Sequence, residues 1–254
     1  MNSFTPWVEK YRPNTFNNIV LDPLNKKILK NIIKTEHFPN LLFYGPPGTG
    51  KTTSIINLIK SHEEFSSEKN LMIHLNASDE RGIDIIRNQI NTFVNTKSFF
   101  NDGMKFVILD EVDYMTKNAQ IALRYLLQDY NPNVRFCLIC NYISRIDEAL
   151  QNEFVRLRFN QLPENEIIKF LNVINEKENL HYSTDTIQLI QKLFNSDIRS
   201  MINYMQSNEQ LIHSKKIIQV NLWNKLTDSI KNCSLDTNLN FFHEISNEYN
   251  IEKR

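Results

Sequence analysis

The chain has 254 residues, which is enough for one large domain or two smaller ones. Lys plus Arg and Asp plus Glu both number 29, so a strongly basic nucleic-acid-binding protein is excluded and any such contact must come from a local basic patch. The 3 cysteines are too few for a disulfide framework, and no run of about 18 apolar residues could span a membrane. We therefore expect a soluble, intracellular protein with no membrane partner.

Short apolar runs alternate along the chain with segments of helical length. The runs cover residues 41–44, 71–75, 106–109, 136–140 and 156–159. Strands that alternate with helices indicate a parallel sheet covered by helices on both faces. The intervening segments repeat apolar residues every three or four positions, as amphipathic helices do. We predict an α/β domain over residues 1–161.

Beyond Pro163 the chain shows helical periodicity and no further strand pattern. We predict a small helical domain over residues 162–208, followed by a short all-helical region over 209–254. Amphipathic segments in that last region lie around 217–230 and 239–251.

Cys137 and Cys140 have a spacing that metal and redox sites also use. They lie inside a predicted strand, where side chains three positions apart point to opposite faces. No second cysteine pair completes a zinc site. We predict that both thiols pack in the core.

The strongest motif is the loop Gly45-Pro-Pro-Gly-Thr-Gly-Lys-Thr52, which follows a predicted strand and opens a predicted helix, as in a P-loop. Glycines let backbone N–H groups wrap phosphates, and the helix N-terminus adds the positive end of its dipole. We predict that the loop binds ATP, with Lys51 on the β- and γ-phosphates and Thr52 on Mg²⁺. The predicted nucleotide-binding residues of the loop are Gly45, Pro46, Pro47, Gly48, Thr49, Gly50, Lys51, Thr52 and Thr53.

Two carboxylates follow the third apolar run. We expect Asp110 to bind the metal together with Thr52, and Glu111 to activate the attacking water, because ligands bind at the carboxyl ends of strands in such sheets. Asn141 ends the next run. It could hold the attacking water or the γ-phosphate, or it could be an ordinary turn residue, and the spacing leaves both interpretations open.

Taken together, these residues resemble the replication factor C clamp-loader family of AAA+ ATPases over residues 5–207. The resemblance implies a P-loop AAA+ sheet domain with a helical lid, in a subunit that works in a ring with other clamp-loader subunits. Such a ring opens a sliding clamp and loads it onto primer–template DNA during replication. The blocks that carry the resemblance are Pro6-Trp-Val-Glu-Lys-Tyr-Arg-Pro13, the P-loop, Asn76-Ala-Ser-Asp-Glu-Arg-Gly-Ile83, Leu109-Asp-Glu-Val-Asp-Tyr-Met115, Phe136-Cys-Leu-Ile-Cys-Asn-Tyr142 and Asp197-Ile-Arg-Ser200.

The resemblance also assigns roles to single residues near the nucleotide. It places Val8 and Arg12 against the adenine. It makes Asn141 a catalytic sensor on the fourth strand and Arg199 a second sensor in the helical lid. Without the resemblance, Arg199 is an ordinary surface charge of a helix.

Partner contacts follow from the same resemblance. It implies that Arg81, Arg87 and Lys117 contact DNA phosphates, which would bind duplex DNA without reading its sequence. It implies that Phe99 and Phe100 contact the sliding clamp. A solvated helix face is the alternative for the three basic residues, and buried core is the alternative for the aromatic pair.

The sequence departs from the family at two places. Where most small subunits have Ser-Arg-Cys after Ala-Leu-Gln, with an arginine that reaches the neighbouring ATP site, this chain has Asn152-Glu153-Phe154. A carboxylate would repel a γ-phosphate there, so we predict that the chain binds ATP in its own site without completing an adjacent one. Arg156 or Arg158 could substitute, but both lie on the following strand, where we favour a structural role. The region after residue 208 is also shorter than the family's helical collar. Either assembly through a collar is in doubt, or the chain is truncated.

Two other functions remain open on the sequence. One is a structural subunit that uses ATP for assembly and does not hydrolyse it, which the intact Lys51, Asp110 and Glu111 argue against. The other is a DNA motor of the branch-migration type, which shares the nucleotide chemistry. The block at residues 79–82 is not expected in such a motor.

Overall fold

The structure is a computed structural model. It divides into two compact units. The first covers the described residues up to Ile167 together with Ser196–Arg199, and the second covers Ile168–Asn195 and the described residues from Ser200 onward. The described residues are 5–35, 37–66, 71–78, 83–95, 103–128, 133–209, 225, 227–231, 238–239 and 241–245, with 66 and 83–87 described by their backbone alone.

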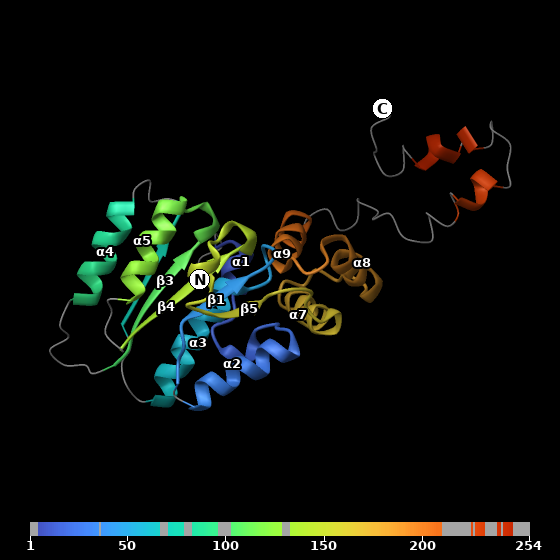
Figure 1. Ribbon diagram of the computed structural model, residues 1–254. Coiled ribbons are helices and arrows are strands. Elements are labelled where there is room, and N and C mark those ends of the chain that lie inside the picture. The colour runs from blue at the N-terminus through green and yellow to red at the C-terminus, as the bar shows by residue number, and fades with distance from the viewer. Residues whose placement is uncertain are drawn as a thin grey trace. The chain divides into compact units, whose positions relative to one another are not determined.

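A five-stranded parallel sheet with strand order β2-β3-β4-β1-β5 forms the centre of the first unit (Figure 1). The five apolar runs are its five strands, so the predicted parallel sheet is confirmed. β1, β3 and β4 are central neighbours, and the residues that follow their carboxyl ends therefore meet at one edge. The strands are β1 Leu41–Tyr44, β2 Leu71–Asn76, β3 Lys105–Asp110, β4 Val134–Cys140 and β5 Val155–Arg158.

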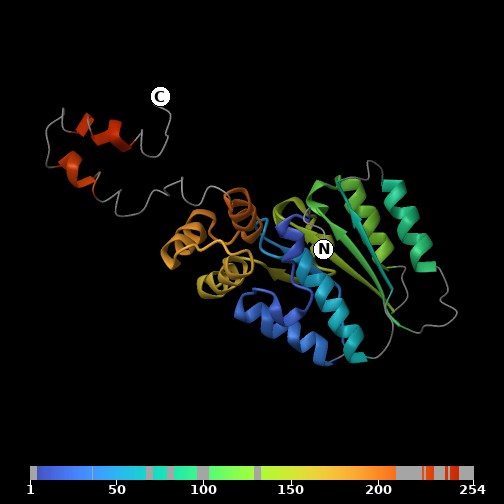
Figure 2. The ribbon, with the colours of Figure 1, turned by 180° about the vertical axis from the view of Figure 1, so that it is seen from behind.

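Helices cover both faces of this sheet, as predicted. α2 and α3 lie on one face, and α4 and α5 lie on the other (Figures 1 and 2). Short 3-10 turns, labelled η, join several elements. The bounds in chain order are α1 Trp7–Lys10, η1 Phe16–Asn18, α2 Pro23–Thr35, α3 Lys51–Ser66, α4 Ile83–Asn95, η2 Val112–Tyr114, α5 Lys117–Gln128, η3 Ile143–Arg145 and α6 Glu148–Gln151.

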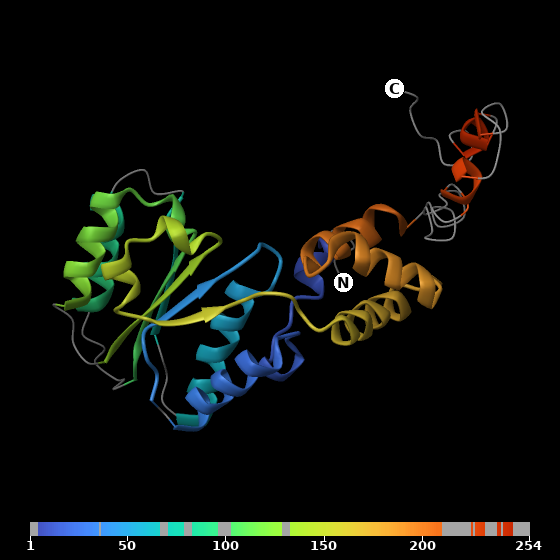
Figure 3. The same cartoon turned by 45° about the vertical axis from the view of Figure 1, so that its right-hand side comes forward.

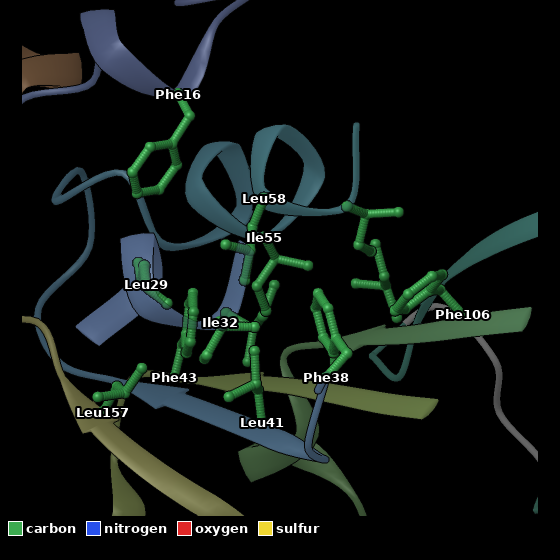
Figure 4. Packing of buried hydrophobic residues seen from close by; sticks show 14 of the residues in the cluster. Phe16, Leu29, Ile32, Phe38, Leu41, Phe43, Ile55, Leu58, Phe106 and Leu157 are labelled. Carbon is green, nitrogen blue, oxygen red and sulfur yellow. The ribbon is translucent and has the colours of Figure 1, made fainter. Parts of the chain in front are cut away.

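Alternating strand residues build a separate hydrophobic core on each face of the sheet. On the first face Phe43 of β1 packs with Leu29 of α2 and Leu58 of α3 (Figure 4). On the opposite face Leu42 of the same strand packs with Leu123 of α5. Burying each such side chain stabilises the fold by about 1.5–3 kcal/mol.

Cys137 and Cys140 belong to different cores, Cys137 to the one under α2 and α3 and Cys140 to the one under α5. Both thiols are buried. Burial raises the pKa of each, that of Cys140 to about 12, so neither is a thiolate at neutral pH. The prediction of core packing on opposite faces is confirmed.

Among its described residues the second unit is helical (Figure 3). It contains most of α7 Glu164–Lys177, all of α8 Thr184–Phe194 and most of α9 Ile198–Ser207. Apolar residues at helical spacing are buried in it, among them Leu171, Ile187 and Met201. Ser183 caps α8, because its Oγ accepts a hydrogen bond from the N–H of Thr186 at 3.2 Å.

After residue 209 the described residues include helical stretches at 227–231 and 241–245. Much of the segments predicted around 217–230 and 239–251 lies outside the described residues. The division into domains at residues 161 and 208 remains a prediction. In the part of the chain that is described, no helix is long and apolar enough to cross a membrane.

Candidate functional site

The loop between β1 and α3 contains two glycines at which a side chain would be strained and would meet close neighbours. Gly45 has φ 142° and Gly48 has φ 72°, both in the region that favours glycine. A Cβ at Gly45 would lie 1.8 Å from the Phe159 carbonyl oxygen, and one at Gly48 would lie 1.8 Å from Asp197 Oδ1. The loop leads directly into α3, whose first N–H groups have no partner within the helix. Such a helix start is suited to binding an anion.

Hydrogen bonds inside the loop hold its shape. The Thr49 hydroxyl is buried and donates to the Pro46 carbonyl at 2.9 Å. The Gly50 carbonyl accepts from both the N–H and the hydroxyl of Ser54, each at 2.8 Å. Pro46 and Pro47 are exposed at the tip. The predicted loop residues therefore form a compact turn that already has a fixed conformation.

Lys51 is only 7% exposed, and its ammonium has three acceptors. Nζ donates to the carbonyls of Gly45 and Pro46 at 2.7 Å each and to Asn141 Oδ1 at 2.9 Å. Burial lowers the pKa of Lys51, and the nearby charge of Arg199 lowers it further, against an opposing effect of Asp110. Phosphate oxygens would make stronger, charge-assisted bonds with this ammonium than its present neutral acceptors do.

Asp110 and Thr52 are joined directly across the edge of the sheet. The Thr52 hydroxyl donates to Asp110 Oδ2 at 2.8 Å, and the N–H of Glu111 donates to Oδ1 at 2.9 Å. Burial raises the pKa of Asp110, but the nearby His74 and the hydrogen bonds from Thr52 and Glu111 outweigh this effect and leave the pKa below its usual value. An ionised carboxylate beside a hydroxyl is a pair of hard oxygen ligands, which suits a divalent cation.

Glu111 has a left-handed backbone, with φ 56° and ψ 37°, at the point where β3 turns into η2. A residue other than glycine in this region costs free energy and is often found at functional sites. The residue predicted to activate water therefore follows Asp110 in a strained turn beside the loop. Its catalytic role remains a prediction.

Val8 and Arg12 belong to the N-terminal residues that pack beside α3. Arg12 Nε donates to Thr53 Oγ1 at 3.2 Å, so Arg12 reaches the last of the predicted loop residues. Val8 is half-buried on α1. Arg199 is exposed, and its charge acts on Lys51. The structure thus brings Arg12 to the loop, and it places Arg199 close enough for its charge to lower the pKa of Lys51.

Two residues near this site were not predicted. His74 Nε2 lies 3.8 Å from Asp110 Oδ2, because β2 pairs in parallel with β3. Asp113 is buried and accepts from the N–H of Tyr142 at 3.3 Å, which holds the residue that follows Asn141. Asp113 could have been predicted, because it lies only three residues after Asp110 in the sequence. His74 could not have been predicted without knowing that β2 is the neighbour of β3.

The arrangement can bind a phosphate chain together with a divalent cation. Comparison with known proteins identifies the chemistry further: residues 41–162 match the family described as ATPase family associated with various cellular activities, AAA. The chain is 42% identical over 202 residues to replication factor C subunit 5 of Homo sapiens, which covers 80% of this chain and 59% of that protein. It is 40% identical over 205 residues to replication factor C subunit 3 of Schizosaccharomyces pombe, covering 81% and 60%. A third relative, replication factor C small subunit 2 of Pyrobaculum islandicum, is 43% identical over 201 residues, covering 79% and 62%.

Over about 80% of its residues the chain is similar to small subunits of replication factor C. It spans less than two thirds of the length of these relatives, 59% of the human one. The match of residues 41–162 to a family of AAA ATPases supports nucleotide binding. A solved structure, a point mutant of RuvB from Thermotoga maritima, matches with a TM-score of 0.61 at 12% identity, over 96% of this chain and 76% of that one. At this identity the likeness shows the AAA+ fold alone.

The replication factor C resemblance also predicted contacts with DNA and with the sliding clamp. Lys117 is exposed at the first residue of α5. Arg81, Phe99 and Phe100 lie outside the described residues, and the side chain of Arg87 is not described. These contacts remain predictions.

Glu153 is exposed in the turn between α6 and β5, where most replication factor C small subunits have their arginine. Of the two arginines that could substitute, Arg156 donates to Gln151 Oε1 at 3.2 Å, and Gln151 is itself buried. Arg158 is exposed on β5. Arg156 therefore has a structural partner within the chain.

Proposed function

We propose that this chain is an ATP-binding and ATP-hydrolysing subunit of a clamp loader, which opens a sliding clamp and loads it onto primed DNA. One observation carries the nucleotide part of the proposal. Lys51 and Thr52, neighbours at the start of α3, are hydrogen-bonded to Asn141 and Asp110. Asp110 is the last residue of β3, and Asn141 directly follows the adjacent strand β4. Four groups that a P-loop ATPase needs are therefore gathered at one edge of the sheet.

Each group has a distinct task in this proposal. Lys51 leaves its carbonyl acceptors and binds the β- and γ-phosphates. Thr52 and Asp110 are the residues that hold Mg²⁺, which supplies charge neutralisation of the phosphates when bound. Glu111 orients and deprotonates the attacking water, while Asn141 holds that water or the γ-phosphate. Arg199 provides further positive charge from the start of α9, and Val8 and Arg12 contact the adenine.

The clamp-loader part rests on the relatives, whose names describe them as replication factor C subunits. The proposed partners are the other subunits of a hetero-oligomeric ring, the sliding clamp and primer–template DNA, in a nuclear or cytoplasmic replication compartment. Arg81, Arg87 and Lys117 would contact DNA phosphates, and Phe99 and Phe100 would contact the clamp. The domains would be a sheet domain to residue 161, a helical lid to 208 and a partial collar-like region.

The ATP site of a neighbouring subunit would not be completed by this chain. Glu153 stands at the position of the arginine finger and is exposed. A negative charge there repels the γ-phosphate, whereas an arginine stabilises the charge of the transition state.

The test is the ATPase activity of a ring reconstituted from this chain and its native partner subunits. We expect primed DNA plus clamp to accelerate hydrolysis, and a Glu111→Gln ring to bind ATP but hydrolyse it more slowly, by about 10²–10⁴-fold at this site if its base is lost. A Glu111→Gln ring with undiminished hydrolysis would favour the non-hydrolysing structural subunit. Translocation along DNA by the chain without any clamp would favour the motor.

A further inference from the structure

The residues from Pro6 to Pro13, here called the N-terminal strap, form a separate element beside α3. Trp7 anchors the strap, since its side chain is 6% exposed. Arg12 ties the strap to α3 through its hydrogen bond to Thr53 Oγ1 at 3.2 Å. Figure 2 shows the N-terminal helix α1 next to the start of α3. The strap therefore lies along the helix that begins in the phosphate-binding loop.

Asn57 makes the second link between the strap and α3. Its side chain is 2% exposed, and Nδ2 donates to the Pro13 carbonyl at 2.8 Å and to the Thr53 carbonyl at 2.9 Å. Both partners can only accept, so the amide nitrogen has to face them. Pro13 and Asn57 are 44 residues apart in the chain.

The other half of the same amide has no partner. Asn57 Oδ1 is buried and accepts no hydrogen bond from the described residues. A buried acceptor without a donor is unfavourable, and an apolar side chain of similar size would avoid it. Stability alone would therefore favour an apolar residue over asparagine at this position. The contact that only the amide provides is the hydrogen bond to the strap.

Thr53 and Asn57 are four residues apart and lie on the same face of α3. Thr53 bonds the side chain of Arg12 and Asn57 bonds the carbonyl of Pro13. Two adjacent strap residues are thus fixed to two successive turns of the helix. The same strap carries Val8 and Arg12, the residues proposed to contact the nucleotide base.

We infer that Asn57 is a positioning residue that holds the strap against α3 and thereby sets the affinity for the nucleoside part of the nucleotide. The inference rests on the proposed function of the loop as an ATP site. It concerns the base and ribose alone, because the phosphates bind to the loop and to Lys51. Asn57 itself contacts no substrate atom in this account.

The test compares two ligands on the full chain, ATP and inorganic tripolyphosphate, each with Mg²⁺ and each measured by calorimetry. Asn57→Leu keeps the volume of the side chain and removes the bond to Pro13. We expect it to raise the Kd for ATP by about five- to tenfold, the size of one hydrogen bond, and to leave the Kd for tripolyphosphate unchanged. We expect the melting temperature to be retained, because the variant also removes the unpaired Oδ1.

Asn25→Leu is the matched control. Asn25 is also buried, and its Nδ2 donates to the Arg158 carbonyl at 2.7 Å, but it lies on α2. This variant loses a comparable amide–carbonyl bond away from the strap and should bind ATP like the unaltered chain. Hydrogen exchange gives a second readout: amides of the strap should exchange faster in Asn57→Leu than in Asn25→Leu.

The outcomes separate this inference from the proposed function. An unchanged Kd for ATP in Asn57→Leu would overturn the inference while leaving the ATP site intact. An equal loss of affinity for ATP and for tripolyphosphate would also overturn the inference, because the substitution would then have disturbed the phosphate-binding loop. If the unaltered chain bound neither ligand, the proposed ATP site itself would fail, and this inference with it.

Discussion

The ammonium of Lys51 and the side-chain oxygen of Asn141 are 2.9 Å apart, although 90 residues separate them in the chain. The contact exists because β1 and β4 are neighbours in the sheet, so the loop after one strand meets the residue after the other. It places Asn141 beside the group that would bind the γ-phosphate. A turn residue with no further role would not need this position.

Asn141→Ala should slow ATP hydrolysis while ATP binding is largely retained. Asn141 would act on the transferring phosphate or its water, and removing one such polar group typically costs about 10²–10³-fold in kcat. Single-turnover hydrolysis and calorimetric binding of the reconstituted ring separate the two effects. Asn31→Ala, an exposed position on α2, serves as the control. A variant that lost binding and hydrolysis equally would contradict this role.

Thr52→Val should lower the stability of the nucleotide-free chain in a pH-dependent way. The Thr52 hydroxyl bonds the ionised Asp110, so its removal should cost about 1.5 kcal/mol at neutral pH. The pKa of Asp110 is depressed below 3.8 in the folded chain, so this contribution is present above pH 3.8 and is lost as the pH falls through the folded pKa. Urea denaturation at a series of pH values measures it.

Thr53→Val is the matched control for that experiment, because the Thr53 hydroxyl bonds Arg12 and not a carboxylate. The loss of stability in Thr53→Val should stay constant as the pH falls through the range in which Asp110 becomes protonated. If the two variants showed the same pH profile, the hydrogen bond between Thr52 and Asp110 would not be what stabilises the carboxylate.

Glu153→Arg should raise the ATPase activity of a reconstituted ring. The exposed carboxylate stands where an arginine would stabilise a neighbour's transition state, so the change replaces repulsion by attraction. Glu153→Gln removes the charge without adding a new one and should give a smaller increase. A large loss of activity in Glu153→Arg would mean that Glu153 already has a productive role.

Lys117→Glu should weaken binding of the ring to primed DNA at low salt, to a similar degree for different sequences. If Lys117 contacts one phosphate, the slope of log Kobs against log salt concentration should become shallower by about 1. Lys27→Glu makes the same charge change on α2, which covers the opposite face of the sheet. Equal effects of the two variants would argue for general electrostatics and against a contact at Lys117.

Sequence periodicity was sufficient to predict the sheet and its loop. Apolar runs fall on all five strands, and the requirement for glycine at Gly45 and Gly48 follows from a motif whose context can be recognised. The opposite facing of Cys137 and Cys140 also follows from the two-residue repeat of a strand. These features are local, so a linear pattern contains them.

Contacts between distant segments could not be predicted in the same way. The sequence left Asn141 open between a turn and a site residue, and only the pairing of β1 with β4 brings it to Lys51. His74 gave no signal, because its approach to Asp110 depends on β2 being the neighbour of β3. Asn57 looked like any polar residue of a helix, and its bond to Pro13 depends on how the strap packs.

The most direct measurement is a crystal structure of the chain with Mg²⁺ and a non-hydrolysable ATP analogue. The account predicts the triphosphate along the loop from Gly45 to Thr53, with Lys51 moved from the Gly45 and Pro46 carbonyls onto phosphate oxygens. It predicts the metal between the phosphates and the pair Thr52 and Asp110. Nucleotide density elsewhere, or an ammonium of Lys51 still bound to both carbonyls with the nucleotide present, would contradict it.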